Sequence, residues 1–185
     1  MWQRQPMMGL IFFSFLAFTL SSCSTYTGTT TSSSGMYSDN TDYESRLPQH
    51  MNTDGKKLIL VDPNVHAWGA YSANGSLVRA GIATAGNSWC DDIKRSCKTA
   101  TGTFRIYSEG NGDCYSTKYP LPHGGGLMPY CMYFHNGMAL HGSPDSTVIE
   151  DNVSHGCVRM RIPDAEWMRY NFASVGTKVI VKPYD

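Results

Sequence analysis

The sequence predicts a mainly β domain with one late α-helix, preceded by a segment that takes no part in the fold. Short apolar or alternating runs with strand character recur from residue 56 onward, and glycine-containing turns separate several of them. Apolar residues with helical spacing follow Pro163, near the C-terminus. The residues before 55 form an apolar leader and a polar stretch, so we expect one folded domain at 55–185.

Seven segments of this domain have strand character, being short and either apolar or alternating. They are residues 56–61, 67–72, 76–84, 103–107, 130–134, 138–140 and 177–182. Ala73-Asn74-Gly75 and His135-Asn136-Gly137 each lie between two of these segments and are typical of hairpin turns. The first and last segments, LysLys-LeuIleLeuVal and TKVIVK, would open and close the domain.

One helix is predicted, directly before the closing strand. Ala165, Met168 and Phe172 fall on one face of a helix, at steps of three and four residues. Pro163 suits the first turn of such a helix, and Gly176 suits the region where it ends. The expected order is therefore a series of strands, then one helix, then the final strand.

The composition is that of a neutral globular protein. Lys and Arg together number 15, as do Asp and Glu, so the formal net charge is +0, and basic runs are absent. This gives no electrostatic reason to expect a nucleic acid as partner. The aromatic content of 12% favours a β-rich surface or an aromatic-lined groove.

The N-terminus predicts export. Residues 1–22 carry one cation, Arg4, ahead of an apolar run from Met7 to Leu20. Such a run is too short for a comfortable transmembrane span and is typical of a signal peptide. It ends in Leu20-Ser21-Ser22-Cys23, which resembles a bacterial lipobox and makes Cys23 the predicted site of lipidation. The alternative is an ordinary signal peptide followed by an unrelated cysteine.

A polar stretch separates Cys23 from the domain. Residues 24–54 are rich in Ser, Thr, Gly and Asn and nearly free of aliphatic side chains, so they are expected to form a flexible tether. With the lipidated Cys23, the tether covers residues 23–54. The predicted location is the periplasmic face of the outer membrane of a Gram-negative bacterium, with the membrane contacted through the lipid anchor. Ser24, which is not Asp, is compatible with that sorting.

The cysteine count predicts one unpaired thiol in the exported domain. Six cysteines are present, and lipidation of Cys23 leaves five, which cannot all pair. Pairing of near neighbours gives Cys90–Cys97 and Cys114–Cys131 and leaves Cys157 over; other pairings stay open. A zinc site built from the four is disfavoured, because their spacing is not CxxC and an export signal favours disulfides.

Cys157 lies in a segment with two glycine-flanked histidines, His141 and His155. A thiolate is a nucleophile, and an imidazole lowers the pKa of a thiol or takes its proton. We expect His141 to be the base, the carbonyl of Gly142 to orient its ring, and the Gly156 and Cys157 amides to form an oxyanion hole. The alternatives are two ordinary loop histidines beside a buried cysteine, and a metal site formed by the three side chains.

These residues carry a resemblance to a known family. His141-Gly142-Ser143, followed by Ser154-His155-Gly156-Cys157-Val158-Arg159-Met160, looks like the catalytic motif of the L,D-transpeptidases of the YkuD type, and Cys157 comes 16 residues after His141. Weaker similarities are Thr101-Gly102-Thr103-Phe104, Met128-Pro129-Tyr130 and Gly176-Thr177-x-Val179. The loop before Ser154 lacks the glycine common in the family, so its shape is expected to differ.

The resemblance implies an L,D-transpeptidase-like β-sandwich and a role in peptidoglycan and cell wall biogenesis, with an influence on cell shape. The Cys157 thiolate would attack the L-centre carbonyl of diaminopimelate in a tetrapeptide stem, release D-Ala and leave a thioester. An amine would then take the acyl group: the side-chain amine of another stem, a lysine of an acceptor protein or a free D-amino acid. No cofactor or metal is implied.

The resemblance also implies which side chains contact the substrate. Ser154, His155 and Arg159 would support the stem, with Arg159 binding a carboxylate. The alternative for Arg159 is a salt bridge with Asp164. Tyr133 and Met128 are candidates for the groove wall, and His123-Gly124-Gly125-Gly126 for a flap over it.

Three other functions stay open at this point. Water as acceptor would make the domain an L,D-carboxypeptidase or an amidase, with the same nucleophile. A papain-like endopeptidase is disfavoured, because there the cysteine precedes the histidine in the chain. The non-enzymatic alternative is a surface lipoprotein that binds the cell wall without catalysis.

Overall fold

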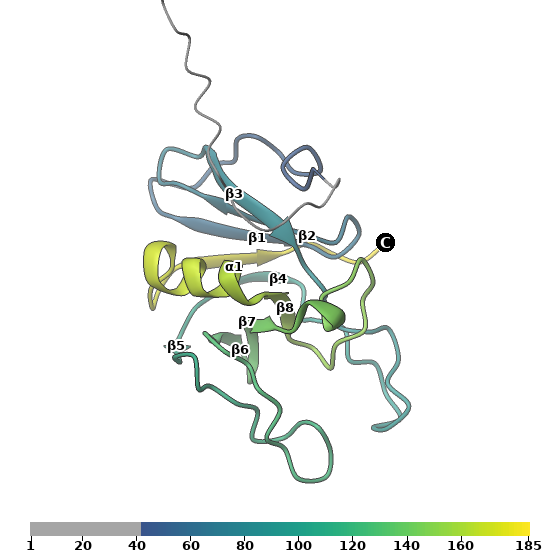
Figure 1. Ribbon diagram of the computed structural model, residues 1–185. Coiled ribbons are helices and arrows are strands. Elements are labelled where there is room, and N and C mark those ends of the chain that lie inside the picture. The colour runs from purple at the N-terminus through teal and green to yellow at the C-terminus, as the bar shows by residue number, and fades with distance from the viewer. Residues whose placement is uncertain (1–41) are drawn as a thin grey trace, which may run out of the picture. The chain divides into compact units, whose positions relative to one another are not determined.

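The computed structural model describes residues 42–185, and nine strands account for most of their regular structure (Figure 1). The strands are β1 (Leu58–Asp62), β2 (Ala67–Tyr71), β3 (Leu77–Ile82), β4 (Gly102–Arg105), β5 (Ser108–Glu109), β6 (Met132–His135), β7 (Met138–Ser143), β8 (Val158–Arg161) and β9 (Lys178–Val181). The helical elements are the 3-10 helix η1 (Asp145–Thr147), the α-helix α1 (Ile162–Trp167) and the π-helical turn η2 (Met168–Phe172).

The strands form two sheets. One has five strands in the order β3-β2-β1-β9-β4, and the other has four in the order β5-β6-β7-β8. Most neighbours are antiparallel, but β1 pairs with β9 and β7 pairs with β8 in parallel. All seven predicted strand segments overlap a strand of the structure. The prediction missed β5 and β8, and β8 carries the motif around Cys157.

A single core cluster joins the two sheets and the helix. It takes apolar side chains from the five-stranded sheet, the four-stranded sheet and the helical segment, among them Ile59, Val61, Trp68, Phe134, Leu140, Met160, Ala165, Met168 and Phe172. The three predicted helix-face residues are therefore buried together. Pro163 lies in the first turn of α1, as expected, and α1 lies beside β7 and β8 (Figure 1). The mainly β fold with one late helix is confirmed.

The β6–β7 hairpin places the histidine strand. Its two connecting residues, Asn136 and Gly137, both have positive φ, at 43° and 82°. Two such residues form the tight turn whose twist matches that of the flanking strands. The predicted turn is thus present, and it fixes the register in which β7 runs back along β6.

Residues 42–54 depart from the expected tether, because they pack on the domain. Leu47 is 4% exposed and joins a cluster with Tyr43 and Val148. The backbone of this segment bonds to the β2–β3 hairpin, with Met51 N–H donating to Gly75 at 2.9 Å. A few apolar side chains suffice here, because they bury against a preformed sheet rather than against one another. Within the described residues, the packed part of the chain therefore includes 42–54 and does not begin at 55.

The same segment also contacts the loop that leads to Cys157. The Tyr43 hydroxyl and the Arg46 guanidinium both donate to Glu150, at 2.9 and 3.0 Å. The predicted signal peptide, the lipidation of Cys23 and the first part of the tether lie outside the described residues. Among residues 42–185, no helix is long and apolar enough to cross a membrane.

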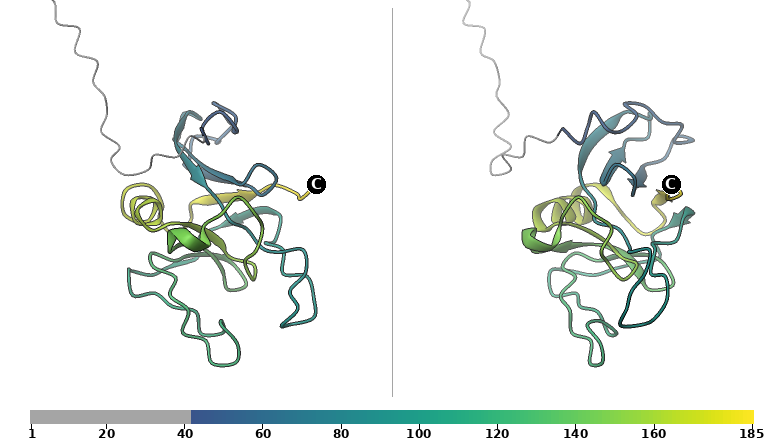
Figure 2. Two further views of the ribbon diagram at one scale, coloured as in Figure 1. Left: turned by 45° about the vertical axis from the view of Figure 1, so that its right-hand side comes forward. Right: turned by 90° about the vertical axis from the view of Figure 1, so that its right-hand side faces the viewer.

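Both predicted disulfides are present. Cys90 is bonded to Cys97 and Cys114 to Cys131, and Cys157 is the free cysteine of the described chain. The chain-entropy model assigns these loops roughly 2.5 and 3 kcal/mol of stabilisation. The second bond closes the base of the long loop between β5 and β6, which extends from the four-stranded sheet at the bottom of the views in Figure 2.

The packing of residues 42–54 leads to a prediction for stability. We expect Leu47→Ala to lower the free energy of unfolding of residues 42–185 by about 2–4 kcal/mol, because it leaves a cavity against the sheet. Glu44→Ala, an exposed neighbour, should change it by less than about 0.5 kcal/mol. Urea denaturation measures both. Equal, small effects would mean that the segment does not pack as described.

Candidate active site

The parallel pairing of β7 with β8 brings the motif residues together. His141 lies opposite Arg159 in the register, and Cys157 immediately precedes β8. Alternate residues of a strand share a face, so Cys157 and Arg159 project to the same side as His141. Val158 and Met160 project to the other side and are fully buried in the core. The buried side chains thus hold β8 in place, and β8 in turn sets the position of the Cys157 thiol.

His141 is held by its own neighbour. Its side chain is 5% exposed, and Nδ1 lies 2.8 Å from the carbonyl oxygen of Gly142. The Nδ1–H therefore donates to this carbonyl, which leaves the lone pair on Nε2. A Cβ at position 142 would lie 3.1–3.2 Å from atoms of Ile162 and Pro129, a tight contact that glycine avoids. The expected orienting contact is present.

Burial keeps the imidazole of His141 uncharged. It lowers the pKa of His141 to about 4, with a smaller contribution from the Arg159 charge, while the Gly142 carbonyl opposes the shift. An imidazole with this pKa is neutral at neutral pH and is ready to accept a proton at Nε2.

Burial also keeps the thiol of Cys157 protonated. It raises the pKa of the Cys157 thiol, against the opposing effects of the Ala139 backbone and the Arg159 charge. The resting pair is therefore a neutral thiol and a neutral imidazole. A neutral pair of this kind suits general-base catalysis, in which the proton leaves the thiol as the sulfur attacks, better than reaction from a preformed ion pair.

Ser154 and Gly156 shape the turn in front of Cys157. The Gly156 N–H donates to the Ser154 hydroxyl at 3.1 Å, and that hydroxyl donates to the Cys157 carbonyl. Gly156 has a φ of +117°, which only glycine adopts without strain. The Gly156 amide, which was expected in the oxyanion hole, thus has a hydrogen-bond partner within the turn. The Ser154 hydroxyl bonds to the backbone of Gly156 and Cys157.

Arg159 does not form the alternative salt bridge. Asp164 pairs with Arg79 at 2.7 Å, and Arg159 instead reaches the carbonyl of Thr147 at 3.4 Å. Its guanidinium is half-buried, and burial lowers its pKa from the usual value. The charge stays close enough to Cys157 and His141 to favour the thiolate and disfavour the imidazolium.

A groove of about 740 Å³ contains the site. Cys157, His141 and Arg159 line it, together with the predicted Met128, Tyr133, Ser154 and His155. Of the predicted flap at 123–126, Gly126 contributes to the lining. Gly142 and Gly156 lie behind this surface and act through their backbones.

Sequence reasoning missed several residues of the groove. Asp92, Arg95, Lys118, Tyr119 and Thr147 also line it. Four of them come from loops far from the motif in the sequence, whereas Thr147 lies in η1, between His141 and Ser154. No sequence pattern marks any of the five. His155 turns toward one of them, Asp92, at 2.8 Å. The alternative metal site of Cys157, His141 and His155 is not formed. Among residues 42–185, the side chains close enough to share a metal ion are Cys90, Asp92 and His155, and Cys90 is in a disulfide.

The sequence also matches the model of a known protein family. The model of the L,D-transpeptidase (YkuD) catalytic domain matches residues 56–181, most of the described chain. The chain belongs to this family. The family that the motif around Cys157 indicated is thereby confirmed. No curated protein matches the chain.

Solved L,D-transpeptidases share the fold of this family member. The enzyme domain from Xylanimonas cellulosilytica is 24% identical with a TM-score of 0.61, over 75% of this chain and 66% of that one. The Mycobacterium smegmatis enzyme is 23% identical with a TM-score of 0.56, over 69% and 59%. L,D-transpeptidase 3 from Mycobacterium tuberculosis, solved with a faropenem-derived adduct, is 18% identical with a TM-score of 0.55, over 69% and 60%. The chain thus spans less than two thirds of each.

The buried His141 predicts a pH dependence of stability for this L,D-transpeptidase-family domain. Its pKa is 6.5 in an unfolded chain and about 4 when folded, so the unfolded state binds more protons between these values. Stability is therefore lost as pH falls from 7 toward 4. His141→Gln should remove about 2 kcal/mol of the loss between pH 7 and pH 5. Urea denaturation at both pH values measures the free energy of unfolding. An equal loss of stability between pH 7 and pH 5 in wild type and variant would contradict the lowered pKa of His141.

Proposed function

We propose that the domain is a cysteine-dependent L,D-transpeptidase acting on the tetrapeptide stems of peptidoglycan. One observation carries the proposal: Cys157, the free thiol of the described chain, lines the same groove as His141, whose ring is oriented through Nδ1. The family membership supports the same reading. The proposed base and its orienting carbonyl lie on β7, and the proposed nucleophile directly precedes the adjacent strand β8, an arrangement that supports the proposal.

The acylation step uses the neutral pair. As the Cys157 sulfur attacks the L-centre carbonyl of diaminopimelate, Nε2 of His141 takes the thiol proton. The tetrahedral intermediate then collapses: the C–N bond to D-Ala breaks, and His141 returns its proton to the leaving amine. A thioester to Cys157 remains. In the second half an amine attacks the thioester and gives a proton to His141. The C–S bond then breaks, and His141 returns the proton to the sulfur of Cys157.

The charges of the groove support a carboxylate-bearing donor. Arg95, Lys118 and Arg159 line it, against the single carboxylate of Asp92. Arginine binds a carboxylate with a planar pair of N–H donors, and its charge is retained at every physiological pH. A stem peptide that ends in D-Ala and carries the diaminopimelate carboxylate fits this surplus of cations.

We further propose that the protein is exported and anchored to the outer membrane through a lipidated Cys23, with residues 24–41 as the link to the domain. The two disulfides support export, because such bonds persist in oxidising compartments. An anchored domain would reach the peptidoglycan from the membrane surface, in keeping with a role in cell wall biogenesis and cell shape.

Intact-mass spectrometry tests the reaction. Residues 42–185 mixed with a diaminopimelate tetrapeptide muropeptide should gain the mass of the stem minus D-Ala on Cys157. Cys157→Ala should gain nothing, and His141→Ala should acylate roughly 10²- to 10⁴-fold more slowly, since it lacks the base. His50→Ala, an exposed histidine away from the groove, is the matched control and should behave as wild type.

The released products identify the acceptor. A cross-linked dimer or an exchanged D-amino acid would establish transpeptidation, whereas a free tripeptide alone would make the domain an L,D-carboxypeptidase. No adduct and no product, with the thiol shown to be free and the domain folded, would contradict the proposal and favour a wall-binding role.

A further inference from the structure

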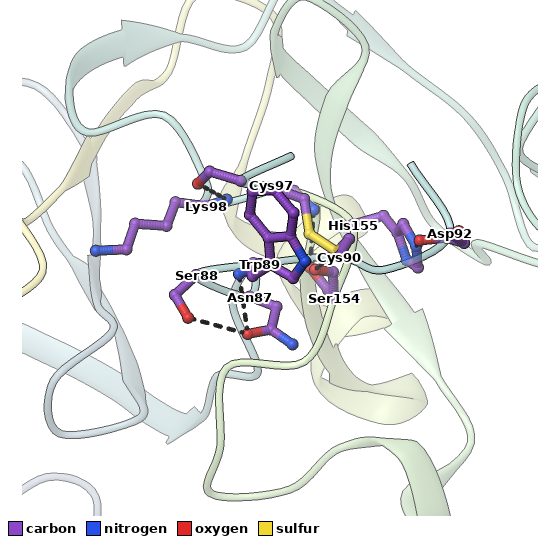
Figure 3. Close-up of a disulfide and its surroundings, with 12 residues drawn as sticks. Asn87, Ser88, Trp89, Cys90, Asp92, Cys97, Lys98, Ser154 and His155 are labelled. Atoms are coloured by element: carbon purple, nitrogen blue, oxygen red, sulfur yellow. Dashed lines mark hydrogen bonds and ion pairs between the residues drawn. A yellow bond between two sulfur atoms is a disulfide. The ribbon is translucent and has the colours of Figure 1, made fainter. Parts of the chain in front are cut away.

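A carboxylate from a separate loop holds the imidazole of His155. Nε2 of His155 lies 2.8 and 3.0 Å from the two carboxylate oxygens of Asp92, and the ring of Tyr119 lies 4.6 Å away, centroid to centroid. Figure 3 shows Asp92 and His155 side by side, next to the Cys90–Cys97 disulfide. His155, Asp92 and Tyr119 all line the groove, so this contact belongs to the wall that a substrate meets.

The loop that carries Asp92 is fastened to the catalytic motif. The Cys90–Cys97 disulfide closes it, and within it the Cys90 N–H donates to the Arg95 carbonyl at 2.9 Å. At its base, Asn87 N–H donates to the carbonyl of Ser154 at 2.9 Å. Ser154 is the neighbour of His155 in the chain. The position of Asp92 relative to His155 is therefore set by covalent and backbone bonds on both sides.

A partly exposed contact between a carboxylate and an imidazole contributes little to stability, typically less than about 1 kcal/mol. The loop does not need the pair either, because its own bonds hold it. What the carboxylate does fix is the ring of His155: it accepts the Nε2–H and leaves Nδ1 as the second nitrogen. The hydrogen bond from His155 also lowers the pKa of Asp92, which keeps the carboxylate ionised and able to accept.

We propose that Asp92 is a positioning residue of the active site, which orients His155 against Tyr119 so that Nδ1 of His155 meets the bound stem peptide. The inference rests on the proposed function for its effect on rate, but its geometric part stands on its own. Asp92 acts through His155 and does not itself contact the reacting atoms.

The chain offers a matched control in the next residue. Asp91 lies in the same disulfide-closed loop and carries the same charge, but it contacts Lys94 at 3.5 Å and the indole N–H of Trp89 at 3.1 Å. It is not part of the groove lining. Replacing Asp91 therefore changes the charge of the loop without touching His155.

A double-mutant cycle tests the effect on the reaction. Acylation of Cys157 by the tetrapeptide muropeptide is followed by intact mass for Asp92→Ala and Asp91→Ala, each alone and combined with His155→Ala. We expect Asp92→Ala to lower kcat/KM about 10-fold or more, because a misplaced contact group weakens transition-state binding. Asp91→Ala should match wild type, and Asp92→Ala should cost nothing further once His155 is gone. Additive losses, or equal losses for the two aspartates, would overturn the proposal.

The tautomer of His155 gives a readout that needs no activity. Long-range ¹H–¹⁵N NMR of the imidazoles should show His155 with its proton on Nε2 in the wild type and in Asp91→Ala, and a mixture of tautomers in Asp92→Ala. An unchanged tautomer in Asp92→Ala would overturn the proposal. If the wild type fails to acylate while the tautomer depends on Asp92, the proposed function fails and the positioning contact stands.

Discussion

The pairing of β7 with β8 is the constraint on which the site depends. These strands are parallel, so they cannot be joined by a short hairpin, and the connection between them runs from Pro144 to Cys157. The pairing places His141 opposite Arg159 and leaves the thiol of Cys157 on the same face. The apolar side chains on the other face lock the register, because a slip of one residue would turn every motif side chain into the core.

Burial then decides the chemistry of the pair. It lowers the pKa of His141 and raises that of the Cys157 thiol, so both rest uncharged. Arg159 is the nearby charge, and it favours a thiolate over an imidazolium. The site therefore stores no ion pair. In the proposed mechanism, charge develops on sulfur only when a substrate arrives, and a protonated thiol is less readily oxidised than a thiolate.

Much of this was predictable from the sequence, and the failures have physical causes. Local patterns predicted the β6–β7 hairpin, the buried helix face and both disulfides. The strand β8 was missed although Val158 to Arg161 alternates apolar and charged residues, because four residues are the shortest alternation that indicates a strand. Asp92 and the packing of Leu47 were beyond reach, since both depend on contacts between distant segments. The hydrogen bond from the Gly156 amide to the Ser154 hydroxyl was not predicted either.

The pH dependence of Cys157 alkylation is the most direct test of the neutral pair. Residues 42–185 would be treated with iodoacetamide from pH 5 to pH 10, and the carbamidomethyl adduct followed by mass. The account predicts a rate that is low near neutral pH and rises only in the alkaline range, above the ordinary thiol pKa of 9.0. A fast rate that is already level at pH 6 would reveal a preformed thiolate–imidazolium pair and contradict it.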